Sequence, residues 1–204
     1  MNAQSEIKKG RKYDQVIDGA AAVFMRDGFE GASVDDIARQ SGVSKATLYS
    51  YFSDKKLLFM AVAQNEICRQ TNINLDDEEM TLPPKQVLTD IGQAFTAFLL
   101  SPFGLSIMRV VIAESARFPE VGQSFFDNGP KLMEDRMVTY FERAEARGEL
   151  SVPDKVQAAH QFLELCKANC FLGKLVGFKP EISEDERLYI VDEAVAMFLA
   201  RYGT

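Results

Sequence analysis

The hydrophobic pattern is clearest in the first third of the chain, where apolar residues recur at the three- and four-residue spacing of a helix. One apolar stripe runs through residues 11–27 and predicts a helix that ends at Gly28. Residues 33–58 then predict two short helices separated by a tight turn at Gly42, followed by the start of a third helix. This order is the pattern of a helix-turn-helix braced by a first helix.

Serines mark the predicted starts of these helices. Ser33, Ser44 and Ser53 each precede a helical stretch, and a serine at that position accepts a hydrogen bond from a free backbone amide. Leu48 and Phe52 lie four residues apart, so they can anchor the back of the second short helix. The opposite face of that helix is polar or small, which suits a DNA groove.

The side chains of this polar face predict two kinds of DNA contact. Ala46 and Thr47 offer methyl groups and one hydroxyl to base edges. Lys45, Tyr49 and Tyr51 offer donors to phosphate oxygens. The two tyrosines could instead be packing aromatics, so the pattern leaves their role open.

A second phosphate contact is predicted at the start of the third helix. Lys55 and Lys56 lie beside a helix N-terminus, whose free amides also attract anions. A further basic cluster at residues 8–12 faces a single acid, Glu6, and is either a DNA-binding arm or a solvated tail.

These residues resemble the tetracycline-repressor (TetR) family of bacterial transcription regulators. The likeness covers roughly the first quarter of the chain, on the following residues: Ser33, Ile37-Ala38, Gly42-Val43-Ser44, Thr47-Leu48-Tyr49, Tyr51-Phe52 and Lys55 to Leu58. The resemblance implies a DNA contact at Ser33, which could otherwise be only a helix cap. The DNA-binding residues predicted by pattern and resemblance together are Ser33, Ser44, Lys45, Ala46, Thr47, Tyr49, Tyr51 and Lys55.

The rest of the chain is also helical in pattern, without a convincing alternating strand. Residues 71–84 are acidic and end in two prolines, so we interpret them as a linker. Further helices are predicted over residues 86–100, 105–117, a short piece around 125–126, 131–147, 154–175 and 183–202. The predicted fold is all-α, with a three-helix DNA-binding head at residues 1–58 and a larger helical ligand-binding and dimerisation body at residues 59–204. A helix running from Ser53 towards Cys68 would connect them as a lever.

The last two predicted helices are apolar on more than one side. A helix at the end of a small domain can bury one stripe in its own core, so the second stripe needs another partner. A homodimer supplies that partner as a four-helix bundle, which is also how the TetR family is known to dimerise. A thicker core within one subunit is the alternative. The predicted dimerisation residues are Phe162, Leu165, Val191, Val195, Phe198 and Tyr202.

Aromatic and methionine side chains of the middle helices could line an apolar cavity for a small ligand. The predicted ligand-binding residues are Phe95, Phe98, Met108, Val111, Phe118, Phe125, Met133 and Met137. Ordinary core packing is the alternative, because a sequence does not show voids. More loosely, the body resembles the ligand domain of the AefR-type subgroup through Arg109, Glu114, Arg117-Phe118-Pro119-Glu120, Phe125, Gly129-Pro130 and Gly148.

The net charge of −7 lies entirely in the body. Residues 1–60 hold nine basic and eight acidic side chains, whereas the remaining 144 residues hold 14 basic and 22 acidic ones. Because salt screens each charge beyond about 10 Å, an acidic body is compatible with a DNA-binding head. The N-terminus has no signal-peptide pattern, and no apolar run approaches the roughly 18 residues of a membrane span, so we expect a cytoplasmic protein with no membrane partner.

The sequence offers little for catalysis. It has one histidine, no glycine-rich nucleotide loop and no evident nucleophile with a base, so we predict that the protein is not an enzyme and has no cofactor. His160, Cys166 and Cys170 share one predicted helix but are too few to hold a metal, which favours packed structural residues. A redox role for Cys68 stays open.

The chain as a whole predicts a repressor that binds a palindromic operator as a homodimer and is released by a small, apolar or aromatic effector. A DNA binder without an effector and a helical protein-interaction adaptor are the alternatives. A helical enzyme would instead show a polar, titratable cleft.

Overall fold

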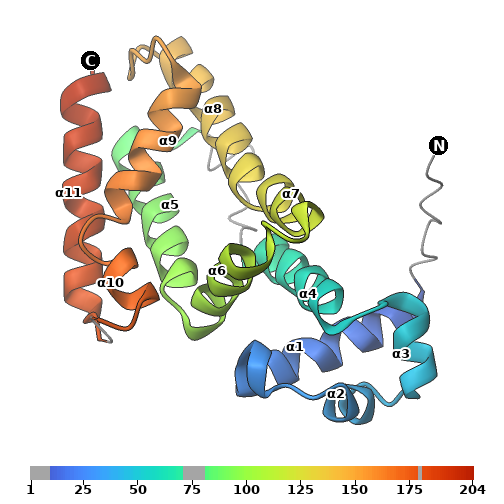
Figure 1. The fold of residues 1–204 in the computed structure, drawn as a ribbon. Helices are drawn as coiled ribbons and strands as arrows, with labels where there is room; N and C mark the ends of the chain where they lie inside the picture. The colour runs from blue at the N-terminus through green and yellow to red at the C-terminus, as the bar shows by residue number, and fades with distance from the viewer. Residues whose placement is uncertain (1–9, 71–80, 179–180) are drawn as a thin grey trace.

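The computed structural model describes residues 10–70, 81–178 and 181–204, and these residues are folded almost entirely into helices (Figure 1). Pairing of extended backbone among them is limited to one isolated bridge, between Leu150 and Gly203. The helices in chain order are α1 (Arg11–Gly31), α2 (Val34–Gln40), α3 (Lys45–Tyr51), α4 (Lys55–Gln70), α5 (Pro84–Leu99), α6 (Pro102–Glu114), α7 (Pro119–Asn128), α8 (Pro130–Ala146), α9 (Lys155–Cys166), α10 (Phe171–Leu175) and α11 (Glu184–Tyr202). The predicted all-α fold class is confirmed.

The helix-turn-helix has the predicted local geometry. The amide of Asp36 donates to Ser33 Oγ at 3.0 Å, and the amide of Thr47 donates to Ser44 Oγ at 3.1 Å, so both serines cap their helices. Gly42 has a φ of 63°, the left-handed conformation that lets the chain turn sharply between α2 and α3. Gly28 interrupts α1 with a φ of 70° and a ψ of 178°, a conformation that is almost restricted to glycine.

The start of α4 differs from the prediction. Ser53 is not the cap, because the amide of Leu57 donates to Asp54 Oδ1 at 2.8 Å. Asp54 directly precedes the helix, which places its carboxylate within reach of the third helical amide. α4 then continues past residue 58, so the predicted domain boundary falls inside a helix.

Most of the predicted linker, residues 71–80, lies outside the described residues, and so do basic residues 8 and 9 and the Cys68 side chain.

The single helix predicted over residues 154–175 is in fact two helices. α9 ends at Cys166 and α10 begins at Phe171. Between them Asn169 has a φ of 60°, a left-handed conformation that asparagine adopts more readily than most residues. The apolar stripes inferred for one continuous helix therefore lose their phase beyond Cys166.

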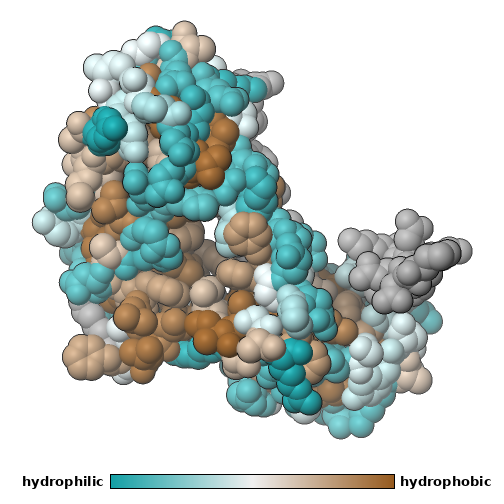
Figure 2. Space-filling model, turned by 45° about the horizontal axis from the view of Figure 1, so that its top comes forward, coloured by the Kyte–Doolittle hydropathy of each residue, from teal (hydrophilic) through white to brown (hydrophobic). Residues whose placement is uncertain are grey.

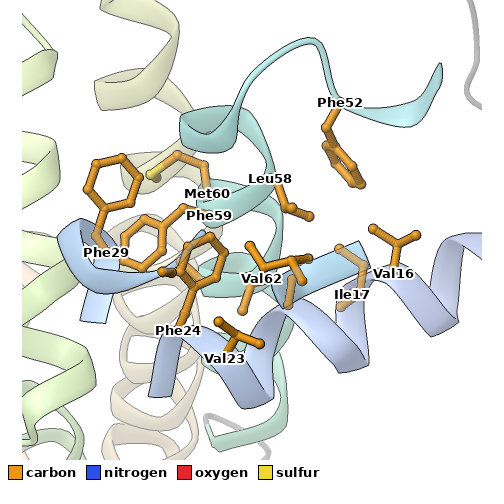
Figure 3. Packing of buried hydrophobic residues seen from close by; sticks show 14 of the residues in the cluster. Val16, Ile17, Val23, Phe24, Phe29, Phe52, Leu58, Phe59, Met60 and Val62 are labelled. Atoms are coloured by element: carbon orange, nitrogen blue, oxygen red, sulfur yellow. The ribbon is translucent and has the colours of Figure 1, made fainter. Parts of the chain in front are cut away.

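The head, formed by α1 to α4, is held together by an aromatic core (Figure 3). The Phe24 ring of α1 meets the Phe59 ring of α4 edge to face, with centroids 4.9 Å apart. The ring centroids of Phe59 and of Phe103 on α6 are 5.9 Å apart, so the same core continues into the body. The other body residues buried in this cluster are Ile107, Val110 and Val121.

A second apolar core lies between α5, α8, α9 and α11. A Cβ on Gly92 of α5 would lie only 2.7 Å from Val191 Cγ1 of α11, which shows how closely these helices approach. Phe141 of α8 stacks on Phe198 of α11 with centroids 5.2 Å apart. Figure 1 shows α6 and α7 between this second core and the head.

No single helix in the described part of the chain is both long and apolar enough to cross a membrane. Only α5 and α6 together reach that length and composition, and they are bent by 70° relative to each other. Phe103, Ile107 and Val110 of α6 are buried in the first core, whereas Val87, Leu88 and Ile91 of α5 are buried in the second.

Candidate nucleic-acid interface

The outer surface of α3 is the candidate DNA-reading surface. Leu48 is fully buried in the head core and so determines which side of α3 faces outward. Ala46, Tyr49 and Ser50 are exposed. Figure 1 shows α2 and α3 at the edge of the head that is turned away from the body. Ser50 was not predicted as a contact, although it lies four residues after Ala46 and hence on the same face.

Lys45 stands at the first position of α3 and forms an exposed ion pair with Asp35 of α2, at 2.6 Å between Nζ and Oδ1. The hydrogen bond from Lys45 to Asp35 raises the pKa of the ammonium and so further favours its charged form. A DNA phosphate must compete with Asp35 for this charge. The sequence pattern does not predict this pairing, because it depends on the angle between two helices.

The predicted hydroxyl contacts already serve the head's own structure. Ser33 Oγ donates to Asp36 Oδ2 at 2.8 Å besides capping α2. Ser44 Oγ and Thr47 Oγ1 lie 2.9 Å apart at the start of α3. These local bonds stabilise the first turns of α2 and α3, and DNA contacts by the three hydroxyls stay predictions.

The two tyrosines of α3 have different surroundings. Tyr49 is half exposed, at 49%, and has room to reach a phosphate. Tyr51 is half-buried and meets Tyr13 of α1 edge to face, with ring centroids 5.8 Å apart. Tyr51 therefore packs within the head, and its contact with a phosphate stays a prediction.

Lys55 is engaged inside the head and does not present a free ammonium. Its Nζ donates to the carbonyl oxygens of Phe29 at 2.8 Å and Ala32 at 3.1 Å, and it lies 4.5 Å from the centre of the Phe29 ring. These partners are 23 and 26 residues away, beyond the reach of local patterns. The structure thus gives Lys55 a role in holding the bend between α1 and α2.

Lys56 connects the head to the body. Its Nζ lies 2.6 Å from Glu114 Oε2 at the end of α6, and 4.4 Å from the ring centre of Phe118. Lys56 thus has a partner in the body, and its phosphate contact stays a prediction. A second polar link runs from Gln64 Nε2 of α4 to Asn128 Oδ1 of α7 at 2.6 Å. α4 is thereby held to both α6 and α7.

The eight predicted effector-binding residues divide between the two cores. Four of them pack as partly buried side chains on the core shared with the head, namely Phe98, Val111, Phe118 and Phe125. Met133 and Met137 are buried in the second core and Phe95 packs against it, while Met108 is half-buried on α6. Their grouping in one effector site stays a prediction.

A groove of about 500 Å³ runs along α9 and α11. Leu165, Phe198 and Tyr202 of the predicted dimer interface line it, together with Met197, which is 57% exposed. Phe162, Val191, Val195 and Phe198 must be corrected, because they are at most 2% exposed inside the subunit's own core, although Phe198 borders the groove. An apolar position has the same sequence pattern whether it faces the subunit's own core or a partner, and here the other helices of the subunit cover these residues.

His160, Cys166 and Cys170, on α9 or just after it, do not form a metal site. His160 Nε2 lies 2.7 Å from Glu134 Oε2 of α8. Burial raises the pKa of the Cys166 thiol to about 12, and the Cys170 thiol donates to the Cys166 carbonyl. Among the described residues no group of His, Cys, Asp or Glu is arranged to hold a metal.

Two family profiles match the chain. Residues 16–62 match the tetR family of bacterial regulatory proteins, and residues 86–204 match the C-terminal domain of AefR-like transcriptional repressors. The chain is 20% identical over 164 residues to the HTH-type transcriptional repressor AcnR of Corynebacterium glutamicum, a match that spans 80% of this chain and 82% of that protein.

Solved structures share the fold. A TetR-family regulator from Mesorhizobium loti superposes with a TM-score of 0.84 at 24% identity, over 96% of this chain and 100% of that one. The flavonoid-responsive regulator FrrA superposes with a TM-score of 0.70 at 29% identity, over 96% of this chain and 98% of that one. The matching family and the relative AcnR are transcription regulators. This confirms the prediction that the protein is a regulator and not an enzyme. The chain belongs to the tetR family of bacterial regulatory proteins, and its body is the C-terminal domain of an AefR-like transcriptional repressor.

Proposed function

We propose that this protein represses transcription by binding a palindromic operator as a homodimer, and that a small aromatic effector releases it. The observation that carries DNA binding is the outer surface of α3, which two serine caps and the buried Leu48 hold in place on the head. A helix presented in this way fits a major groove about 12 Å wide.

The groove along α9 and α11 supports the homodimer. Leu165, Met197 and Tyr202 bring apolar surface to it, while Gln157 and Glu164 make its edge polar. This composition is typical of a subunit interface with an apolar centre and a polar rim. A two-fold dimer also places two copies of α3 for two half-sites about 34–36 Å apart, which explains a palindromic operator.

The effector is proposed from the body. FrrA, to which the chain is similar over nearly its whole length, is a flavonoid-responsive regulator. The partly buried Phe118 lies between α6 and α7, and Phe125 lies on α7, so both offer aromatic rings against which a planar ligand can stack. An aromatic molecule lodged beside these helices would lie close to their contacts with the head.

Release follows from the contacts of α6. Glu114 at its end pairs with Lys56 of α4, so a shift of α6 moves the head. An effector that prefers the shifted arrangement weakens operator binding, at most by the factor of that preference. By reciprocity, operator weakens effector binding by the same factor.

Footprinting on the DNA that flanks the protein's own gene tests this proposal. We expect two protected patches related by a palindrome, and their loss when a flavonoid aglycone is added. Thr47→Ala should change the base preferred at one position of each half-site, while Ser53→Ala serves as a control that leaves the footprint intact. A single protected half-site would contradict the homodimer, and protection that persists with every aromatic compound would contradict the effector.

A further inference from the structure

The helix-turn-helix carries no net charge, although it is the part of the head that we propose to meet DNA. Residues 33–51 hold two bases, Arg39 and Lys45, and two acids, Asp35 and Asp36. Figure 2 shows the head, at the lower right, covered largely by hydrophilic and intermediate side chains, whereas strongly apolar ones gather along the lower edge of the body. The helix-turn-helix is therefore polar without the excess of positive charge that attracts a polyanion.

Both bases of the helix-turn-helix are paired with an aspartate at the start of α2. Asp36 pairs with Arg39 on the same helix and also accepts a hydrogen bond from Ser33 Oγ at 2.8 Å. Asp35 instead reaches across the turn, with 2.6 Å between its Oδ1 and Lys45 Nζ of α3. The first pair belongs to the local structure of α2, whereas the second joins two helices at the surface.

The pair of Asp35 with Lys45 lies where we propose that DNA approaches. Lys45 is the first residue of α3, and a recognition helix contacts DNA with its N-terminal residues. The Asp35 side chain is 70% exposed and that of Lys45 54%, so both are open to an approaching phosphate. The ammonium attracts the phosphate, but the carboxylate beside it repels the phosphate.

Any phosphate contact by Lys45 must replace its contact with Asp35. A carboxylate on the same head competes as an intramolecular partner, with a high effective concentration. An exposed ion pair changes an equilibrium constant by up to about fivefold, and a dimer breaks one such pair in each head. The pair therefore lowers the affinity for DNA of every sequence, because phosphate contacts carry no sequence information.

We propose that Asp35 is a positioning residue that limits DNA affinity by holding the Lys45 ammonium away from phosphate. This inference rests on the proposed operator binding and deepens it. An effector weakens operator binding by a fixed factor at most, so a lower starting affinity makes release more complete. Asp35 thus acts on release without touching the effector.

Fluorescence anisotropy of the full chain with two labelled duplexes tests this role of Asp35. One duplex carries the footprinted operator and the other an unrelated sequence. Asp35→Asn should bind both about fivefold more tightly than the unaltered protein, whereas Asp35→Glu, which keeps the carboxylate, should bind as the unaltered protein does. A merely structural Asp35 would give the opposite sign, because loss of a residue that supports α2 weakens the helix-turn-helix.

The matched control is Asp27→Asn. Asp27 is also an aspartate of the head paired with a base, at 2.5 Å between its Oδ2 and Arg26 Nη2, but it lies on α1, outside the helix-turn-helix. Its loss should leave both affinities unchanged. In a Lys45→Met background, Asp35→Asn should gain less than in the unaltered protein, because no pair is left to break and only the repulsion of phosphate is removed.

The outcomes separate this inference from the proposed function. If the unaltered protein protects a palindromic operator but Asp35→Asn binds no more tightly, Asp35 does not limit affinity although the function stands. Equal gains from Asp35→Asn and Asp27→Asn, or equal gains from Asp35→Asn with and without Lys45, would mean that net charge alone acts, and the inference falls. A gain confined to the operator duplex would show that Asp35 reads a base, which also overturns it. A protein that binds neither duplex would overturn the function and the inference together.

Discussion

Lys55 shows how one side chain can take a structural role where the sequence pattern predicts a DNA contact. Its ammonium satisfies the carbonyls of Phe29 and Ala32. Lys55→Met keeps most of the apolar stem but removes this donor, so we expect the free energy of unfolding to fall by about 1–3 kcal/mol. Urea denaturation measures this loss, and the salt dependence of DNA binding should keep its slope.

Lys45→Met is the matched control, because Lys45 is an exposed partner of a surface ion pair. Its effect on stability should be within about 1 kcal/mol. The slope of DNA affinity against salt should instead drop by about one ion, since one phosphate contact is lost. The opposite pattern, with Lys55→Met stable and its slope reduced, would return Lys55 to the DNA interface.

Glu134 is a single residue whose contribution to the free energy of unfolding depends on pH. The hydrogen bond from Lys131, and then the one shared with His160, lower the pKa of this carboxyl. A carboxyl with a depressed pKa in the folded state stabilises the fold fully above its ordinary pKa of about 4.3, and this contribution is lost as the pH falls through the lower folded value. Glu134→Gln should therefore reduce the free energy of unfolding at pH 7 and have no effect in strong acid.

The measurement is a series of urea denaturations between neutral and acidic pH. Glu142→Gln on the same helix is the control, because Glu142 is exposed. A difference between Glu134→Gln and the unaltered protein that stays constant across the whole pH range would show that ionisation of Glu134 contributes nothing.

At the scale of single elements, the start of α4 distinguishes two neighbouring candidates for the cap. Asp54 accepts the amide of Leu57, whereas the Ser53 side chain is exposed one residue earlier. Asp54→Ala should cost about 1 kcal/mol of unfolding free energy, and Ser53→Ala close to nothing. Thermal denaturation of the two variants side by side decides it, and equal losses would mean that the cap is shared.

Two residues of α11 distinguish packing within a subunit from the proposed packing between subunits. Val195 is 2% exposed in the second core, whereas Met197 lies in the groove and is 57% exposed. Val195→Glu should unfold the body, because it buries an unpaired charge. Met197→Glu should leave the subunit folded and weaken the dimer.

Circular dichroism and sedimentation of the two variants give these outcomes independently. A folded, dimeric Met197→Glu protein would remove the groove from the interface. A folded but monomeric Val195→Glu protein would restore the original assignment of Val195 to the subunit contact.

At the scale of the whole molecule, the head and body are joined through one apolar core and the pair of Lys56 with Glu114. Lys56→Met and Glu114→Gln break the same contact, so their effects on operator affinity should not add. A double-mutant cycle should give a coupling of about 1 kcal/mol, or roughly fivefold in the dissociation constant.

Fluorescence anisotropy with labelled operator measures this cycle. Glu120→Gln on α7 is the control, since Glu120 is exposed, and it should combine additively with Lys56→Met. Additive losses for Lys56→Met and Glu114→Gln would mean that the ion pair does not position the head.

The sequence by itself determined the local parts of this protein. Ser33, Ser44 and Gly42 act on neighbours within four residues, so their roles as caps and turn follow from spacing alone. The all-α fold and the exposed face of α3 follow from the same short-range periodicity. The prediction that Ser53 caps α4 was wrong by one residue, because the adjacent Ser53 and Asp54 can both accept a backbone amide.

Only the tertiary structure decided which surfaces meet. The partners of Lys55 and Lys56 lie 23 to 58 residues away, and Lys45 finds Asp35 only through the angle between two helices. Likewise, an apolar stripe looks the same in a sequence whether it faces its own core or a partner. Val195 and Met197 are told apart because the other helices of the subunit cover one side of α11 and leave the other open.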